Sequence, residues 1–186
     1  MTLATPRLIL RRWRQEDRLP FARLNVDPAV MEFFPARLSA EETDRFIDAI
    51  EAYFERYGFS LWAVELRESP GFIGYVGLWT VGFHAHFTPA VEIGWRLAAE
   101  HWGHGFATEG AREVLRFGFE EAGLDEIVSF TAPANVRSRR VMEKIGLTHD
   151  PRDDFDHPNL PAGHPLGKHV LYRIRRQEWT EGHRVR

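Results

Sequence analysis

A strand that runs into a glycine turn and then directly into a helix is the feature that most constrains this chain. Residues 90–97 (AVEIGWRL) read as a strand, and apolar side chains recur at helical spacing from about residue 106 to 122. Gly103 and Gly105 lie between them and permit positive φ and a close approach to the backbone. The first turn of a helix has unpaired N–H groups and the positive end of the helix dipole. The segment therefore predicts an anion site, although two glycines before a helix can equally form a tight turn without a ligand.

Two well-known phosphate loops fit this segment poorly. A Walker loop has a lysine before Ser or Thr at the start of the helix, and here the segment is Phe106-Ala107-Thr108. A Rossmann fingerprint needs a third glycine, where this chain has Thr108, and an acid at the end of the next strand. Asp125 and Glu126 instead lie at the beginning of the strand expected at 126–131, which is the wrong end. Dinucleotide binding is therefore disfavoured.

The rest of the chain predicts one α/β (α+β) domain over residues 1–186. Gln15 to Phe34 should be helical in two pieces that break at Asp27-Pro28, and a capping box at Ser39–Glu42 should begin a helix that ends at Gly58. Further strands are expected at 7–14, 59–67, 72–82, 126–131 and 169–175, with a short helix at 136–145 and a long loop at 150–168. This order predicts a mixed, strongly twisted sheet of six or seven strands with about four helices.

Composition excludes several classes of function. The chain has no cysteine, which excludes disulfides, cysteine-ligated zinc and a cysteine nucleophile. A net charge of −3 gives no electrostatic reason to expect nucleic-acid binding, and no apolar run is long enough for a membrane span. The nine histidines form no tight metal motif, so we expect no metal, and we expect a cytoplasmic protein.

Four segments together resemble the GCN5-related N-acetyltransferase (GNAT) superfamily, and within it the branch of enzymes that acetylate the N-terminal alanine or serine of ribosomal proteins. The string W-G-x-G-[FY]-A-T-E occupies residues 102–109, with Trp102 where the superfamily usually has Gln or Arg. The other segments are TPRLILRR at 5–12, EIGW at 92–95, and Asn135-x-x-Ser138 followed by EKIGL at 143–147.

The resemblance implies the family's fold, with two central parallel strands, 90–97 and 126–131, splayed apart. It implies acetyl-CoA as the co-substrate and direct transfer to a primary amine, either a protein N-terminus or a small molecule, in a possible homodimer. The residues it assigns to acetyl-CoA are Trp102, Gly103, His104, Gly105, Phe106, Ala107, Thr108, Asn135 and Ser138. Backbone N–H groups from about Gly103 to Thr108 should hold the pyrophosphate, and Asn135 should bind the pantetheine arm.

Glu92 is the best candidate for the group that removes a proton from the amine. It lies on the central strand, and alternation directs it to the face opposite Val91 and Ile93. The alternatives are a Glu that orients the substrate or one that pairs with an arginine.

The family's usual tyrosine, the acid for the departing thiolate, is replaced by Met142. Ser138 is the local substitute as a hydrogen-bond donor to sulfur, although a residue three positions after an N-cap at Asn135 can also be a tolerated polar residue.

Two further hypotheses remain open. The first, motivated by Met142, is a sensor that binds acyl-CoA without catalysis. The second is a transferase whose donor is a longer acyl-CoA. The loop at 150–168 is expected to cover the acceptor site, where its acids would attract a cationic amine, with a solvated surface loop as the alternative.

Overall fold

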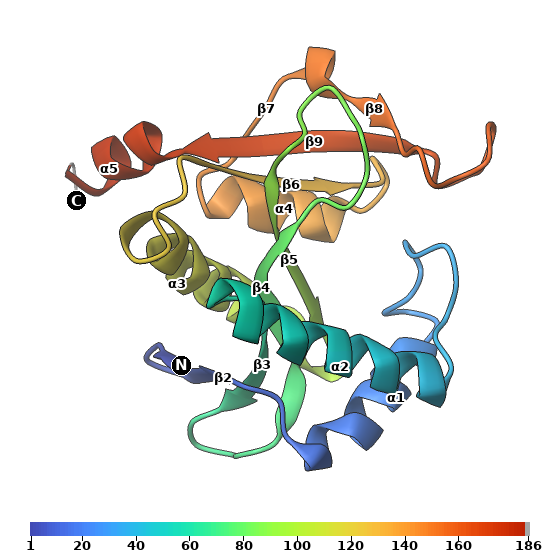
Figure 1. Cartoon of the computed structure of the whole chain (residues 1–186), viewed down its shortest axis with the longest axis vertical. Coiled ribbons are helices and arrows are strands. Elements are labelled where there is room, and N and C mark those ends of the chain that lie inside the picture. Colours follow the sequence, from blue (N-terminus) through green and yellow to red (C-terminus); the bar gives the residue numbers. More distant parts are fainter. Residues whose placement is uncertain (185–186) are drawn as a thin grey trace.

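The computed structural model describes the backbone of residues 1–184 and the side chains of residues 1–181, and it has one mixed sheet between two layers of helices (Figure 1). The strand order is β1-β2-β3-β4-β5-β6-β9-β7, with β8 paired to β9. The strands are β1 Leu3–Ala4, β2 Leu8–Arg11, β3 Leu61–Leu66, β4 Phe72–Thr80, β5 Val91–Leu97, β6 Glu126–Thr131, β7 Thr148–His149, β8 Phe155–Asp156 and β9 Lys168–Arg175. The helices are α1 Arg18–Val26, α2 Ala40–Tyr57, α3 Phe106–Glu120, α4 Val136–Lys144 and α5 Arg176–Arg184.

The side chains of β4 point alternately toward the two layers of helices. The Tyr75 ring packs on Phe21 of α1 and Phe46 of α2, at centroid distances of 5.9 and 6.4 Å. The neighbouring Val76 and Leu78 point to the opposite face, where they lie against the glycines of α3. Because side chains alternate between faces, each layer of helices covers one face of the sheet.

The capping box and the terminal glycine that the sequence predicts at the two ends of α2 are confirmed. The Ser39 hydroxyl accepts a hydrogen bond from the Glu42 backbone N–H, and the Glu42 carboxylate accepts one from the Ser39 N–H. Gly58 ends the helix with φ 76°, in the left-handed region that favours glycine.

The sheet opens between its two central parallel strands. β4 and β5 pair over seven residues, and β6 and β9 over six. β5 and β6 share a single pair, Glu92 with Val128. Beyond that pair the strands diverge, which confirms the expected splayed strands (Figure 1).

Several boundaries differ from the sequence-based expectations. The described residues form nine strands and five α-helices, because β1, β7 and β8 have two residues each and α5 continues directly from β9. Residues 28–34 form turns and not a second helical piece. Asp27 is extended before Pro28, and its carboxylate accepts from the Ala29 N–H at 2.8 Å, which favours a turn over a helix.

Candidate active site

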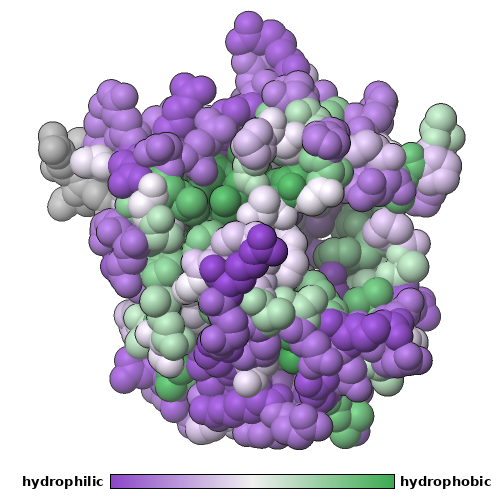
Figure 2. All heavy atoms as spheres, viewed as in Figure 1, coloured by the Kyte–Doolittle hydropathy of each residue, from purple (hydrophilic) through white to green (hydrophobic). Residues whose placement is uncertain are grey.

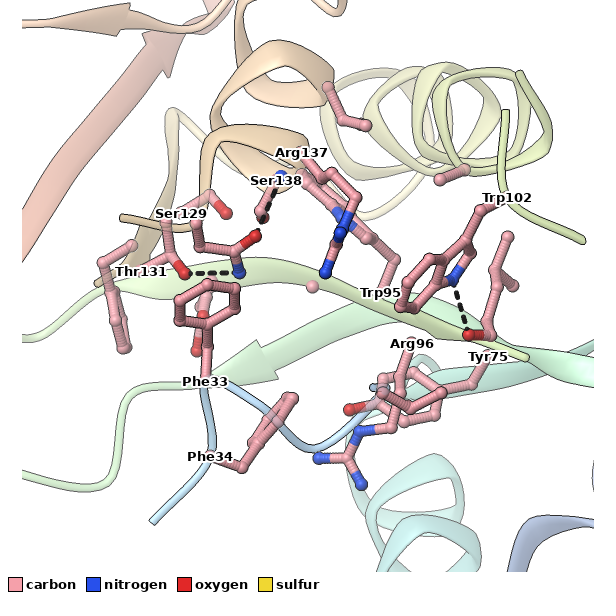
Figure 3. A pocket seen from close by; sticks show the side chains of 18 of the residues that line it. Phe33, Phe34, Tyr75, Trp95, Arg96, Trp102, Ser129, Thr131, Arg137 and Ser138 are labelled. Atoms are coloured by element: carbon pink, nitrogen blue, oxygen red, sulfur yellow. Dashed lines mark hydrogen bonds between the residues drawn. The ribbon is translucent and has the colours of Figure 1, made fainter. Parts of the chain in front are cut away.

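A cleft of about 690 Å³ lies where β5 and β6 diverge (Figure 3). Its walls come from β5 and β6, the glycine turn before α3, the start of α4, the segment that joins α1 to α2, and the segment 157–169. Figure 2 shows a recess right of centre with hydrophobic residues at its back. The cleft therefore extends to both layers of the molecule through the opening in the sheet.

The glycine turn has the backbone conformation that the sequence predicts. Gly103 has φ 80° and Gly105 has φ 81°, and Gly105 is the N-cap of α3. A Cβ on Gly103 would meet no atom within 4 Å, so this part of the turn is open. Both glycines line the cleft together with Phe106, Ala107 and Thr108. The free N–H groups at the start of α3 thus lie beside the cleft.

A clamp from the N-terminal segment holds this turn, and the sequence analysis did not identify it. The Glu109 carboxylate accepts hydrogen bonds from the Thr5 hydroxyl (2.6 Å), the Arg7 backbone N–H (2.9 Å) and Arg7 Nε (2.6 Å). Arg7 also donates to the His104 carbonyl at 3.0 Å and lies 4.7 Å from the centroid of the Phe106 ring. Burial raises the pKa of Glu109, but these hydrogen bonds outweigh it and lower the pKa overall. The partners are about a hundred residues apart, so local patterns do not reveal them.

Trp102 and His104, both expected to contact the cofactor, occupy different environments. Trp102 lines the cleft, where its indole N–H donates to the Leu97 carbonyl at 2.9 Å and Arg137 lies 4.4 Å from its ring centroid (Figure 3). His104 is not among the cleft-lining residues, and its ring stacks on Phe106. Trp102 therefore joins the end of β5 to α4, whereas His104 takes part in the clamp.

Asn135 and Ser138 lie together at the start of α4. Asn135 Oδ1 accepts from the Ser138 backbone N–H at 3.2 Å, and its Nδ2 donates to the Thr131 hydroxyl at 3.0 Å (Figure 3). An amide has two donors and two acceptor sites, so one of each remains. The Ser138 hydroxyl makes no hydrogen bond to the described residues, and both residues line the cleft. Asn135 is thus an N-cap as the sequence indicates, with bonding capacity left for a ligand.

Glu92 lies at the point where the sheet opens. Its side chain lines the cleft and makes no hydrogen bond or ion pair with the described residues, so the arginine pairing considered above is absent from this part of the chain. Burial raises its pKa to about 8. Once ionised, a carboxylate with this pKa is a stronger base than an ordinary carboxylate.

Met142 lies in the hydrophobic core and not in the cleft. It is 1% exposed, belongs to the hydrophobic core and is not among the residues that line the cleft. The position where the resembling family has its tyrosine therefore contributes packing.

The face of the cleft toward α1 and α2 is aromatic and contains one buried cation, Arg96. Phe33 and Phe34 come from the segment after α1, and their contribution was not foreseen because that segment was expected to be helical. The Arg96 guanidinium lies 4.0 Å from the Phe34 ring centroid and 5.5 Å from that of Tyr75 (Figure 3). Its Nη1 donates to Asn25 Oδ1 at 2.5 Å.

The segment 150–168 contributes apolar and imidazole groups to the cleft. His157, Leu160 and Leu166 line it, with His169 of β9. Burial lowers the pKa of His157 and of His169. The expectation that the acids of this loop attract a cationic amine stays a prediction, and the attraction would act from outside the cleft. Each acid pairs locally, and none lines the cleft: Asp150 with Arg152, Asp153 with Arg173, Asp154 with His149, and Asp156 with Lys168.

The described residues contain neither a cluster suited to a metal ion nor a helix suited to span a membrane. No group of three or more His, Asp or Glu side chains in this part of the chain has an arrangement that could hold a metal ion. None of its helices is both long enough and apolar enough to cross a membrane.

The fold is that of an acetyltransferase. The structure superposes on that of an acetyltransferase (GNAT family) from Bacillus anthracis with a TM-score of 0.77 and 26% sequence identity, over 95% of this chain and 99% of that one. It also superposes on the ribosomal-protein-S5-alanine acetyltransferase from Vibrio fischeri with a TM-score of 0.76, over 96% and 98% of the two chains; at 15% identity this likeness concerns the fold alone.

Sequence comparison places the chain within a family. Residues 7–148 match the acetyltransferase (GNAT) domain, so the chain belongs to the GNAT acetyltransferases. A curated relative, the FsC-acetyl coenzyme A-N(2)-transacetylase of Aspergillus fumigatus, is 34% identical over an alignment of 194 positions, which covers 96% of this chain and 77% of the relative. The expectation of an N-acetyltransferase is confirmed at the level of the family.

Proposed function

We propose that this protein transfers the acetyl group of acetyl-CoA directly to a primary amine, on a small molecule or a protein N-terminus. The observation that carries the proposal is the opening of the sheet beside the glycine turn, with a single residue pair between β5 and β6. Strand backbone groups that lack a partner need hydrogen bonds, and the amides of a pantetheine arm can supply them. The name of the relative from Aspergillus fumigatus, an acetyl coenzyme A-N(2)-transacetylase, supports this assignment.

The donor side of the cleft suits a diphosphate. The N–H groups at the start of α3 are unpaired and carry the positive end of the helix dipole. Arg137, Arg140 and Lys144 of α4 line the same side and add positive charge. In this proposal the backbone from Gly103 to Thr108 binds the pyrophosphate, and Asn135 binds the arm with its remaining donor and acceptor.

Glu92 and Ser138 are the side chains we assign to the chemistry. The amine nitrogen forms a bond to the thioester carbonyl carbon, and the C–S bond breaks to release CoA thiolate. Glu92 takes the proton that the amine loses, directly or through water. The Ser138 hydroxyl donates a hydrogen bond to the departing sulfur, which takes up a proton from solvent. The transfer has no covalent enzyme intermediate.

One observation favours a second candidate, a sensor that binds acyl-CoA without turnover. The buried Met142 cannot protonate a thiolate, and its side chain does not reach the cleft. A longer acyl donor also stays possible in a cleft with aromatic walls. The homodimer and the cytoplasmic location expected from the sequence stay predictions.

The test measures binding and turnover separately. We expect acetyl-CoA to raise the melting temperature and a panel of primary amines to release free CoA, with N-acetylated product identified by mass. Binding without CoA release for any amine would support the sensor. Competition by longer acyl-CoA thioesters identifies the preferred donor. If the protein does not bind CoA at all, the acetyltransferase, the sensor and the transferase with a longer acyl donor are all overturned.

A further inference from the structure

Two arginines among the described residues are fully buried, and their surroundings differ. Arg11 is 5% exposed, and its guanidinium binds the carboxylates of Glu65 and Asp17 at 2.7 Å each. Those hydrogen bonds and charges raise its pKa despite burial. Arg11 shows how this chain compensates a buried cation that has a structural role.

Arg96 is 7% exposed and lacks this compensation. It makes one side-chain hydrogen bond, to the neutral Asn25, and pairs with no carboxylate of the described residues. Its Nε is buried without a partner. A buried charge is costly unless it is paired, so this arrangement suggests a partner that comes from outside the chain.

Arg96 lines the same cleft as Glu92, and the backbone leaves room between the two residues. Glu92, Gly94 and Arg96 lie on the same face of β5, because every second residue of a strand points to the same side. A Cβ on Gly94 would meet no atom within 4 Å, so this face is open between the two charged groups. Phe34, Tyr75 and Phe46 supply apolar walls (Figure 3).

We propose that the amine acceptor carries a carboxylate at its far end, and that Arg96 binds this carboxylate while the amine lies near Glu92. This inference rests on the proposed function and specifies its substrate class. The rise of a strand is about 3.3 Å per residue, which places the two Cα atoms about 13 Å apart. Side chains stand roughly perpendicular to a sheet, so the Glu92 carboxyl and the Arg96 guanidinium are taken to be about as far apart as their Cα atoms. Hydrogen bonds of about 3 Å at each end then leave about 7 Å between amine nitrogen and carboxylate.

An ω-amino acid with an apolar chain of several methylenes has this shape. The methylenes contact the aromatic rings, and the planar guanidinium offers its free N–H groups to the carboxylate. An α-amino acid without a second amine is too short to reach both groups. The inference therefore favours a terminal amine well separated from its acid.

The first experiment uses the unaltered protein with saturating acetyl-CoA. Initial rates of CoA release are measured with 6-aminohexanoate, whose extended chain has the required length, with its neutral amide, with hexylamine and with the shorter 4-aminobutanoate. We expect kcat/KM for 6-aminohexanoate to exceed that for its amide about tenfold or more, mainly through KM, as for a lost hydrogen bond to a charged group. Equal values for acid and amide would overturn the inference and leave amine acetylation intact.

The second experiment removes the cation. We expect Arg96→Gln to reduce the ratio of acid to amide kcat/KM to about one. Arg23→Gln makes the same charge change on an exposed residue of α1 outside the cleft, and it should keep the full ratio. A ratio that Arg96→Gln leaves unchanged would contradict the role of Arg96. If Arg96→Gln does not fold, the comparison of acid and amide on the unaltered protein decides whether a carboxylate is recognised. If no amine in the panel releases CoA although acetyl-CoA binds, the proposed function fails and this inference fails with it.

Discussion

Glu92 combines three properties that belong together in a general base. It lies at the single pair between β5 and β6, lines the cleft, and makes no hydrogen bond or ion pair with the described residues. Burial raises its pKa to about 8, which keeps the carboxyl mostly protonated at neutral pH. At the scale of one residue, the role that we propose for Glu92 therefore predicts that both activity and stability depend on pH.

The pH profile of activity tests this link. We expect kcat/KM to rise as pH passes through about 8, because a base acts only when Glu92 is ionised. Glu92→Gln should remove this step and lower the rate about a hundredfold, within the usual range for general-base catalysis. Glu100→Gln, on an exposed residue outside the cleft, is the control. An unchanged profile in Glu92→Gln would refute the assignment.

Stability should change with pH in the opposite sense. The unfolded carboxyl ionises near its model value of 4.5, whereas the folded one stays protonated up to about pH 8. Between these values the folded state binds more protons, so stability falls as pH rises, by up to about 1.4 kcal/mol per pH unit. Glu92→Gln removes this penalty. We expect its melting temperature relative to the parent to increase from pH 5 to pH 8, as measured by calorimetry; a constant difference would contradict the shifted pKa.

At the scale of elements, the first turn of α3 is held by contacts remote in sequence. Thr5 and Arg7 from the β1–β2 segment bind Glu109 of α3, and Arg7 binds the carbonyl of His104 within the turn. The clamp fixes the N–H groups that we assign to the pyrophosphate. Rigid donors lose less entropy on binding than mobile ones.

Weakening the clamp should therefore weaken the binding of CoA. Glu109→Gln loses the charge that pairs with Arg7, and we expect the Kd for CoA by calorimetry to rise about tenfold. Glu41→Gln alters a surface ion pair with Arg45 in α2 and serves as control, because exposed pairs contribute little. Equal CoA affinity in the two variants would show that the clamp does not support binding.

The two capped helices allow a matched comparison. Ser39 caps α2 away from the cleft, and Asn135 caps α4 at its edge. Ser39→Ala and Asn135→Ala should each lower the free energy of unfolding by about 1 kcal/mol, since each removes an N-cap. Only Asn135→Ala should also weaken CoA binding. Equal CoA affinity in both would limit Asn135 to capping.

At the scale of the whole molecule, the opening divides the sheet into two parts around one cleft, with β1 to β5 on one side and β6 to β9 on the other. Backbone groups of β5 that face β6 lack the ladder found between β4 and β5. We expect bound CoA to slow amide hydrogen exchange at residues 93–97 and 129–131, measured by mass spectrometry, and to leave the β2–β3 ladder unchanged. Uniform protection across all strands would indicate global stabilisation and not occupation of the gap.

The parts of this architecture that were predictable depend on local chemistry. The glycine turn, the start of α3 and both caps follow from residues a few positions apart. The aromatic wall, the Arg7–Glu109 clamp and the isolation of Arg96 depend on contacts between distant segments, which no local period encodes. Strands of two residues are too short for alternation to reveal, so β1, β7 and β8 were missed.

The two ends of the cleft differ in the kind of atom they offer. Main-chain amides of the turn and of the parted strands form the end that we assign to the acyl donor, and main-chain amides persist through most amino-acid replacements. Side chains of the α1–α2 connection and of the 157–169 segment form the other end, where each replacement alters shape or charge. Descendants of this chain can therefore exchange one acceptor for another by a few point changes while their thioester remains the same.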